Sequence, residues 1–139
     1  MRKLPLLLLP FVLCPLFAAE ELPLVFRDDF SNGADAWEPT DVKAWKITEI
    51  DGDPAYEILG GSKYEPPHRS PINIAIRKDG NVGDFVLTAR VQTKQTPRGH
   101  RDMCLVFGYQ SPANFYYVHL GQETDPHANQ IFLVNEAPR

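Results

Sequence analysis

Short apolar-polar alternating segments, separated by turn residues, follow one another along most of the chain. No window longer than ten residues carries a sustained 3.6-residue period, so the sequence predicts no α-helix of ordinary length. A succession of short strands at this spacing is typical of β-sandwiches and jelly rolls. Clean alternation in several of them favours antiparallel sheets with one solvated face. We therefore expect an all-β fold, an antiparallel jelly-roll sandwich.

The pattern predicts strands over residues 24–30, 44–50, 55–59, 72–76, 84–93, 103–110, 115–121 and 131–134. Asp51 and Gly52 predict a tight hairpin turn between the second and third of these. Prolines exclude the stretch 63–71 from a central strand. In residues 84–93, alternation assigns Phe85, Leu87, Ala89 and Val91 to the core.

The last predicted strand ends five residues before Arg139, and no later strand follows to cover its edge. An uncovered apolar edge invites pairing with other chains. We therefore expect this sequence to lack the C-terminal strands of its jelly roll and to be the N-terminal part of a longer domain.

Residues 1–19 have the pattern of a secretory signal peptide, with Arg2 and Lys3 before an apolar run and Ala18 and Ala19 after it. The run, residues 4–17, is shorter than the roughly 20 residues that a membrane-spanning helix needs. We expect residues 20–139 to form the jelly-roll domain of a secreted or periplasmic protein. A lipoprotein interpretation through Cys14 is weaker, because Leu13 stands where lipid attachment needs a small residue.

Without Arg2 and Lys3, 12 of the 14 basic residues remain against 18 acidic residues, which gives a formal charge of −6. That balance disfavours nucleic acid and anionic membranes as partners, since both require a basic face. Only Cys104 then remains, so no internal disulfide is expected. Cys104 lies in an apolar strand and is best explained as a small buried hydrophobe. No cofactor motif is visible.

Several motifs occur in an order that resembles a known class of exported domains. They are the segment 26–33 (FRDDFSNG) with Trp37 after it, the segment 45–47 (WKI) leading to Gly60 and Gly61, the segment 84–87 (DFVL), and the segment 114–120 (NFYYVHL). Together they resemble concanavalin-like or laminin-G-like jelly rolls of exported bacterial proteins, most closely the 3-keto-disaccharide hydrolase class. The resemblance implies carbohydrate as the partner and further strands beyond this sequence.

The strand over 115–121 carries the main candidate site. Period two puts Phe115, Tyr117 and His119 on one face and Tyr116, Val118 and Leu120 on the other. We take the second set as core and the first as the solvated, concave face of the sheet.

Arg90, Tyr117 and His119 are then expected on one solvated face as catalytic candidates, with Gln92 and Gln130 as substrate-binding residues. Tyrosine can stack on a sugar or donate a proton, histidine can act as a base near neutral pH, and arginine can bind a uronate carboxylate. These three residues resemble the set of catalytic residues of jelly-roll polysaccharide lyases. The alternative is a solvated strand face without a function.

His100 and Arg101 are further candidates for substrate binding, because loops carry many binding residues. Asp102 beside them is best explained as an ion-pair partner. No metal site is expected from His68, His100 and His127, which lack the spacing of a local ligand motif.

Two sets of acidic residues also have structural explanations. Glu49, Asp51 and Asp53 partly match the paired carboxylates of retaining glycosidases, but Gly52 and Pro54 interrupt the strand and a turn explains them better. A loop with Glu123, Asp125 and Asn129 has oxygen ligands for calcium, though not the spacing of an EF-hand.

The sequence therefore predicts an exported domain that binds glycan on the concave sheet face. The alternatives are a glycan-cleaving enzyme, either a hydrolase of the keto-disaccharide class or a polysaccharide lyase, and a structural domain of the cell envelope.

Overall fold

The computed structural model describes residues 22–94, 96 and 100–137, without the side chains of residues 100–102. The predicted signal peptide, residues 1–19, lies outside this part. Within it, the chain forms seven strands and one 3-10 turn. In chain order these are β1 (Trp37–Pro39), η1 (Val42–Ala44), β2 (Trp45–Ile50), β3 (Asp53–Ile58), β4 (Ala75–Arg77), β5 (His100–Ser111), β6 (Asn114–Gly121) and β7 (Gln130–Asn135).

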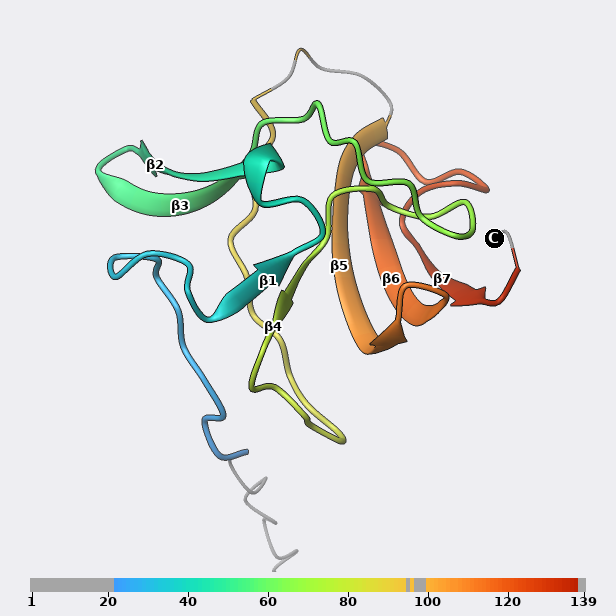
Figure 1. Ribbon diagram of the computed structural model, residues 1–139, viewed down its shortest axis with the longest axis horizontal. Helices are drawn as coiled ribbons and strands as arrows, with labels where there is room; N and C mark the ends of the chain where they lie inside the picture. The colour runs from blue at the N-terminus through green and yellow to red at the C-terminus, as the bar shows by residue number, and fades with distance from the viewer. Residues whose placement is uncertain (1–21, 95, 97–99, 138–139) are drawn as a thin grey trace, which may run out of the picture.

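The strands form three small antiparallel sheets, which pair β1 with β4, β2 with β3, and β5 with β6 and β7 in that order. Figure 1 shows the three-stranded sheet on the right and the β2–β3 hairpin projecting to the left. The prediction of an all-β, antiparallel fold is confirmed. None of the three sheets closes into a barrel. No helix in the described residues is long and apolar enough to span a membrane.

The β2–β3 hairpin forms where the turn residues predicted it. Asp51 and Gly52 connect the strands with φ angles of 53° and 87°. Positive φ at both central residues is what a type I′ hairpin turn requires, and an Asp-Gly pair tolerates it. The register then places Trp45 opposite Ile58 and Ile47 opposite Tyr56.

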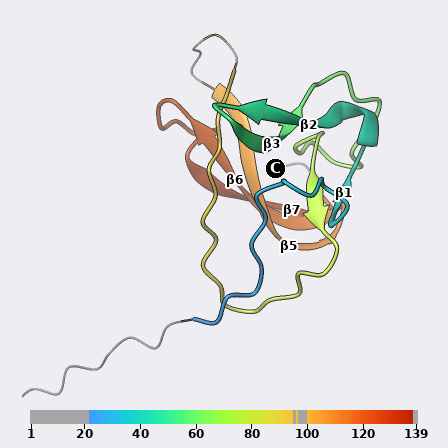
Figure 2. The same ribbon diagram turned by 90° about the vertical axis from the view of Figure 1, so that its left-hand side faces the viewer.

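The core lies between the face of β5–β7 and the short β1–β4 pair. Ile74, Phe115, Tyr117 and Val134 form its buried centre, and Ile76 packs against them. Figure 2 shows the same arrangement after a quarter turn, with β1 next to the strands of the larger sheet. Burying these apolar side chains is the main favourable term that holds the layers together.

The predicted assignment of the two β6 faces is therefore wrong. Phe115 and Tyr117 are each 1% exposed and His119 is 6% exposed, whereas Tyr116 is 42% exposed. Both faces of β6 carry large apolar groups, so alternation alone does not decide which face is buried. The β1–β4 layer decides it, because Ile74 and Ile76 cover the face with Tyr117.

Two predicted strands are absent from the described residues. Residues 24–30 have no regular structure, and neither have residues 84–93. Phe85, Leu87, Ala89 and Val91, which alternation assigned to the core, are all exposed. The reason is that no other described segment lies in register beside residues 84–92 to accept their backbone hydrogen bonds.

Ion pairs tie this exposed segment to the β2–β3 hairpin. Arg90 Nη2 lies 3.0 Å from Asp53 Oδ2, and Lys94 Nζ lies 2.7 Å from Glu57 Oε1. The hydrogen bond from Lys94 is the main reason why the pKa of Glu57 falls below its ordinary value. Exposed pairs of this kind contribute little stability. They show that the segment lies beside the hairpin.

We expect Lys94→Met to raise the pKa of Glu57 toward its ordinary value of 4.5. Because the pKa of Glu57 is lowered in the folded state, the pair stabilises the fold above pH 4.5 and loses its effect as the pH falls through the folded-state pKa. A carboxyl-carbon NMR titration measures the shift. Lys78→Met is the control, because Lys78 bonds to the Asp35 carbonyl instead. An unchanged pKa in the Lys94 variant would contradict this assignment.

Candidate functional site

Tyr117 and His119 lie in the interior. Tyr117 packs against Phe115 and Phe132, with ring centroids 6.0 and 5.2 Å away. The Nδ1 of His119 hydrogen-bonds the backbone carbonyl of His127 at 2.6 Å, so the imidazole holds the loop before β7 against the sheet. Neither side chain lines a solvated groove in the described structure, and their predicted catalytic roles remain predictions.

The other predicted site residues are not gathered around them. Arg90 is 88% exposed and paired with Asp53 on the hairpin. Gln92 is exposed on the same unpaired segment, and Gln130 donates its amide to the Asp125 carbonyl at 2.5 Å. The side chains of His100 and Arg101, and of Asp102, lie outside the described residues. The structure thus does not bring the predicted residues together in one groove.

The alternative acidic sites have structural roles. Asp51 occupies the hairpin turn, and Asp53 begins β3. In the loop before β7, Asp125 accepts the backbone N–H of His127 at 2.6 Å, and the Asn129 side chain accepts that of Gly121 at 3.0 Å. Among the described residues, no group of three or more His, Cys, Asp or Glu side chains is placed to hold a metal ion.

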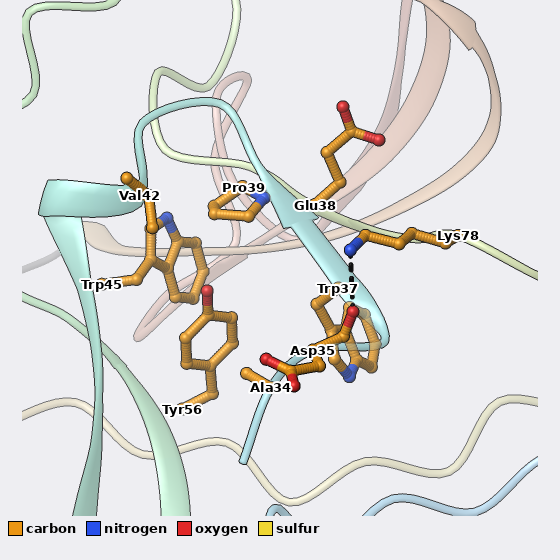
Figure 3. Close-up of a pocket in the computed structure, with 9 residues that line it drawn as sticks. All are labelled: Ala34, Asp35, Trp37, Glu38, Pro39, Val42, Trp45, Tyr56 and Lys78. Carbon is orange, nitrogen blue, oxygen red and sulfur yellow. Dashed lines mark hydrogen bonds between the residues drawn. The ribbon is translucent and has the colours of Figure 1, made fainter.

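A pocket of about 550 Å³ opens elsewhere, between β1, η1, the β2–β3 hairpin and the residues after β4. Its volume lies within the roughly 300–1,000 Å³ of small-molecule sites. Figure 3 shows Trp45 and Tyr56 on one side of it and Trp37 on the other. Its lining residues are Ala34, Asp35, Trp37, Glu38, Pro39, Val42, Trp45, Tyr56 and Lys78.

Trp37 is held in place from behind the pocket. Its indole Nε1 donates to Asp28 Oδ2 at 2.8 Å, and the Arg77 guanidinium lies 3.3 Å from the same carboxylate. Arg77 also lies over the Phe26 ring at 4.6 Å. This network fixes the orientation of Trp37, so little side-chain entropy remains to be lost when a ligand binds.

The aromatic lining continues from Trp37 to the hairpin. Phe30 lies between the two sides, with its ring centroid 5.9 Å from Trp37 and 5.6 Å from Tyr56. Tyr56 in turn stacks on Trp45 at 4.6 Å with an interplanar angle of 33°. Offset contacts of this kind stabilise aromatic clusters. Ring contacts therefore connect the three aromatic side chains of the lining, directly between Tyr56 and Trp45 and through Phe30, which does not line the pocket, between Tyr56 and Trp37.

The Tyr56 phenol and two carboxylates give the wall polar chemistry. Burial raises the pKa of Tyr56, which keeps its phenol a neutral hydrogen-bond donor into the alkaline range. The indole N–H of Trp45 is buried without a hydrogen-bond partner among the described residues, so it is not a donor on the pocket surface. Asp35 and Glu38 add carboxylates to the lining, while Lys78 donates to the Asp35 backbone carbonyl at 2.8 Å (Figure 3).

Sequence reasoning did not single out this pocket, although one pattern pointed to it. The segment 26–33 and the following Trp37 resemble a family motif, and this resemblance by itself predicts no pocket. In the structure, Phe26, Asp28 and Phe30 of this motif contact Trp37. The register that brings Trp45 and Tyr56 beside it is set by the hairpin turn and was not used to predict a site.

The chain was compared with protein-family models, with curated proteins and with solved structures, and none of the three comparisons gives a match.

Proposed function

We propose that this domain binds neutral carbohydrate in the pocket lined by Trp37, Trp45 and Tyr56. The observation that carries the proposal is the combination of three aromatic side chains and two carboxylates around one pocket. This replaces the sheet face with Tyr117 as the glycan site, because that face is buried.

The lining matches what a sugar presents. The C–H groups on one face of a pyranose ring carry partial positive charge, and aromatic faces carry a negative quadrupole that attracts it. The hydroxyl groups around the ring need both donors and acceptors. The Tyr56 phenol can donate, and the carboxylates of Asp35 and Glu38 can accept charge-assisted hydrogen bonds. The same carboxylates repel uronates, so a neutral sugar fits better.

An exported jelly roll related to the 3-keto-disaccharide hydrolase class is part of the same proposal. The packing of the β1–β4 pair on the β5–β7 sheet supports a sandwich of two antiparallel layers. The apolar run before residue 20 supports a secreted or periplasmic location.

Glycan cleavage is the second candidate function. It is favoured by the presence of both Asp35 and Glu38 in the pocket lining, since glycosidases use a pair of carboxylates flanking the scissile bond. Binding and cleavage at this pocket would use the same aromatic residues. In binding, Asp35 and Glu38 would only accept hydrogen bonds, whereas in cleavage they would also take part in the reaction.

One experiment separates these functions. The full chain is incubated with neutral oligosaccharides (cellopentaose, xylopentaose and chitopentaose) and with oligogalacturonate. Binding is followed by calorimetry and products by chromatography. We expect saturable binding of at least one neutral oligosaccharide. New shorter products would favour the enzyme, and binding without products the binding module. Binding of oligogalacturonate alone would contradict the pocket proposed here, and no binding at all would favour a structural domain of the envelope.

A further inference from the structure

Residues 84–92 (DFVLTARVQ) have the composition of a strand but no strand beside them. All of them are exposed, including Phe85 at 43%, Val86 at 78% and Leu87 at 45%. Between residues 85 and 94 the backbone has neither turn nor bend. This segment, yellow in Figure 1, runs from the loop after β4 toward β5. No backbone hydrogen bond joins residues 84–92 to any other described residue.

Such a segment offers two kinds of unused interaction. Its row of N–H and C=O groups is a template for another strand. Its exposed valine, leucine and phenylalanine side chains have high strand propensity and lose water when a neighbouring strand pairs with them. The occupant that satisfies both is an extended strand, because only main-chain pairing uses the whole row.

The segment is complementary to itself in one antiparallel register. When Leu87 lies opposite Leu87 of a second copy, Phe85 lies opposite Ala89 and Val86 opposite Thr88. Phe85 then faces the small Ala89 on one face of the ladder, and the β-branched Val86 and Thr88 face each other on the other, which allows close cross-strand contact. A twofold axis at Leu87 produces the Phe85–Ala89 and Val86–Thr88 pairs twice and the Leu87 pair once, as an isologous interface requires.

The charged residues of the segment favour the same register, with Leu87 opposite Leu87. Asp84 falls opposite Arg90, so each dimer contains two oppositely charged cross-strand pairs. Opposite charges placed directly across a ladder stabilise it, and like charges destabilise it. The Arg90 side chain is 88% exposed although it pairs with Asp53 of its own hairpin, so its guanidinium remains accessible to a second partner.

We propose that two copies of this chain associate through antiparallel pairing of residues 84–90, centred on Leu87. The pairing adds roughly eight inter-strand hydrogen bonds. None of the paired residues lines the aromatic pocket. It concerns a surface separate from the proposed glycan site and does not depend on glycan binding.

Sedimentation equilibrium of the full chain over a range of concentrations is the first test. We expect a reversible monomer–dimer equilibrium. Asp84→Arg puts like charges across both pairs and is expected to weaken the dimer about tenfold or more. The double variant Asp84→Arg with Arg90→Asp restores opposite charges and is expected to recover dimerisation. Loss of the Arg90–Asp53 ion pair alone cannot produce that recovery, so the rescue is specific to the paired register.

Cross-linking reports the register directly. Leu87→Cys places two thiols opposite each other at a Cα separation of about 4.5–5.5 Å, within disulfide range. Ala89→Cys is the matched control on the same strand face, because its two copies lie about 14 Å apart along the ladder. We expect mild oxidation to give a covalent dimer with Leu87→Cys and little with Ala89→Cys.

A protein that remains monomeric at every concentration overturns the proposal. So does a dimer that is insensitive to Asp84→Arg and cross-links equally at positions 87 and 89, since it would form through another surface. A monomer in which the amides of residues 84–92 are protected from hydrogen exchange would place a different segment or polypeptide on this strand, and it would also overturn pairing with a second copy.

Discussion

Trp45→Ala is expected to weaken binding of the neutral oligosaccharide by about 30-fold or more. The reason is that a buried aromatic residue at the centre of an interface typically contributes about 2 kcal/mol or more. Trp45 lines the pocket and stacks on Tyr56 at 4.6 Å, so its removal takes away one stacking surface and loosens another. Isothermal titration calorimetry on the full chain measures the loss.

Two further variants separate a lost contact from a disturbed fold. Glu38→Gln keeps the shape of the exposed side chain, removes its charge and is expected to weaken binding about tenfold. Tyr116→Ala removes an exposed aromatic side chain outside the pocket and is expected to leave affinity unchanged. If Trp45→Ala binds as tightly as the parent, or if Tyr116→Ala weakens binding equally, the glycan does not bind in this pocket.

Tyr117→Ala is expected to lower the free energy of unfolding by about 3–5 kcal/mol, because it removes a large buried aromatic side chain and leaves a cavity. Tyr117 is 1% exposed and belongs to the central cluster with Phe115 and Val134. Urea unfolding followed by circular dichroism measures the change. A loss of this size is a large part of the stability of a small domain.

The neighbouring residue provides the control. Tyr116→Ala, on the same strand but on the opposite face, removes a side chain that is 42% exposed and stacks on Phe107 at 5.5 Å. We expect about 1 kcal/mol or less, the typical contribution of a cross-strand aromatic pair. Equal costs for the two variants, or a larger cost for Tyr116→Ala, would mean that the other face of β6 is buried.

Local chemistry explains which parts of the fold could be predicted. The β2–β3 hairpin follows from Asp51 and Gly52, whose positive φ angles form the turn that their types favour. The β5–β6 hairpin forms with the two residues Pro112 and Ala113 between its strands, close to where the polar break predicted it. In each case the deciding interactions lie within a few residues of one another along the sequence.

What could not be predicted depends on long-range packing. The choice between the faces of Tyr116 and Tyr117 depends on where Ile74 and Ile76 lie, and no local pattern contains that information. Residues 84–93 alternate like a strand, yet alternation does not supply a partner for their backbone. The pocket could not be predicted for the same reason. Its aromatic residues Trp37, Trp45 and Tyr56 come from three strands in two different sheets.

The most direct test of glycan binding at the pocket uses the intrinsic fluorescence of tryptophan. The chain contains two tryptophans, Trp37 and Trp45, and both line the pocket. A bound sugar must therefore change the surroundings of the only two indole fluorophores. We predict that the neutral oligosaccharide that binds in calorimetry also changes the tryptophan emission, saturably and with the same dissociation constant. Saturable binding in calorimetry with an unchanged tryptophan emission would contradict the account, because it would place the glycan elsewhere on the protein.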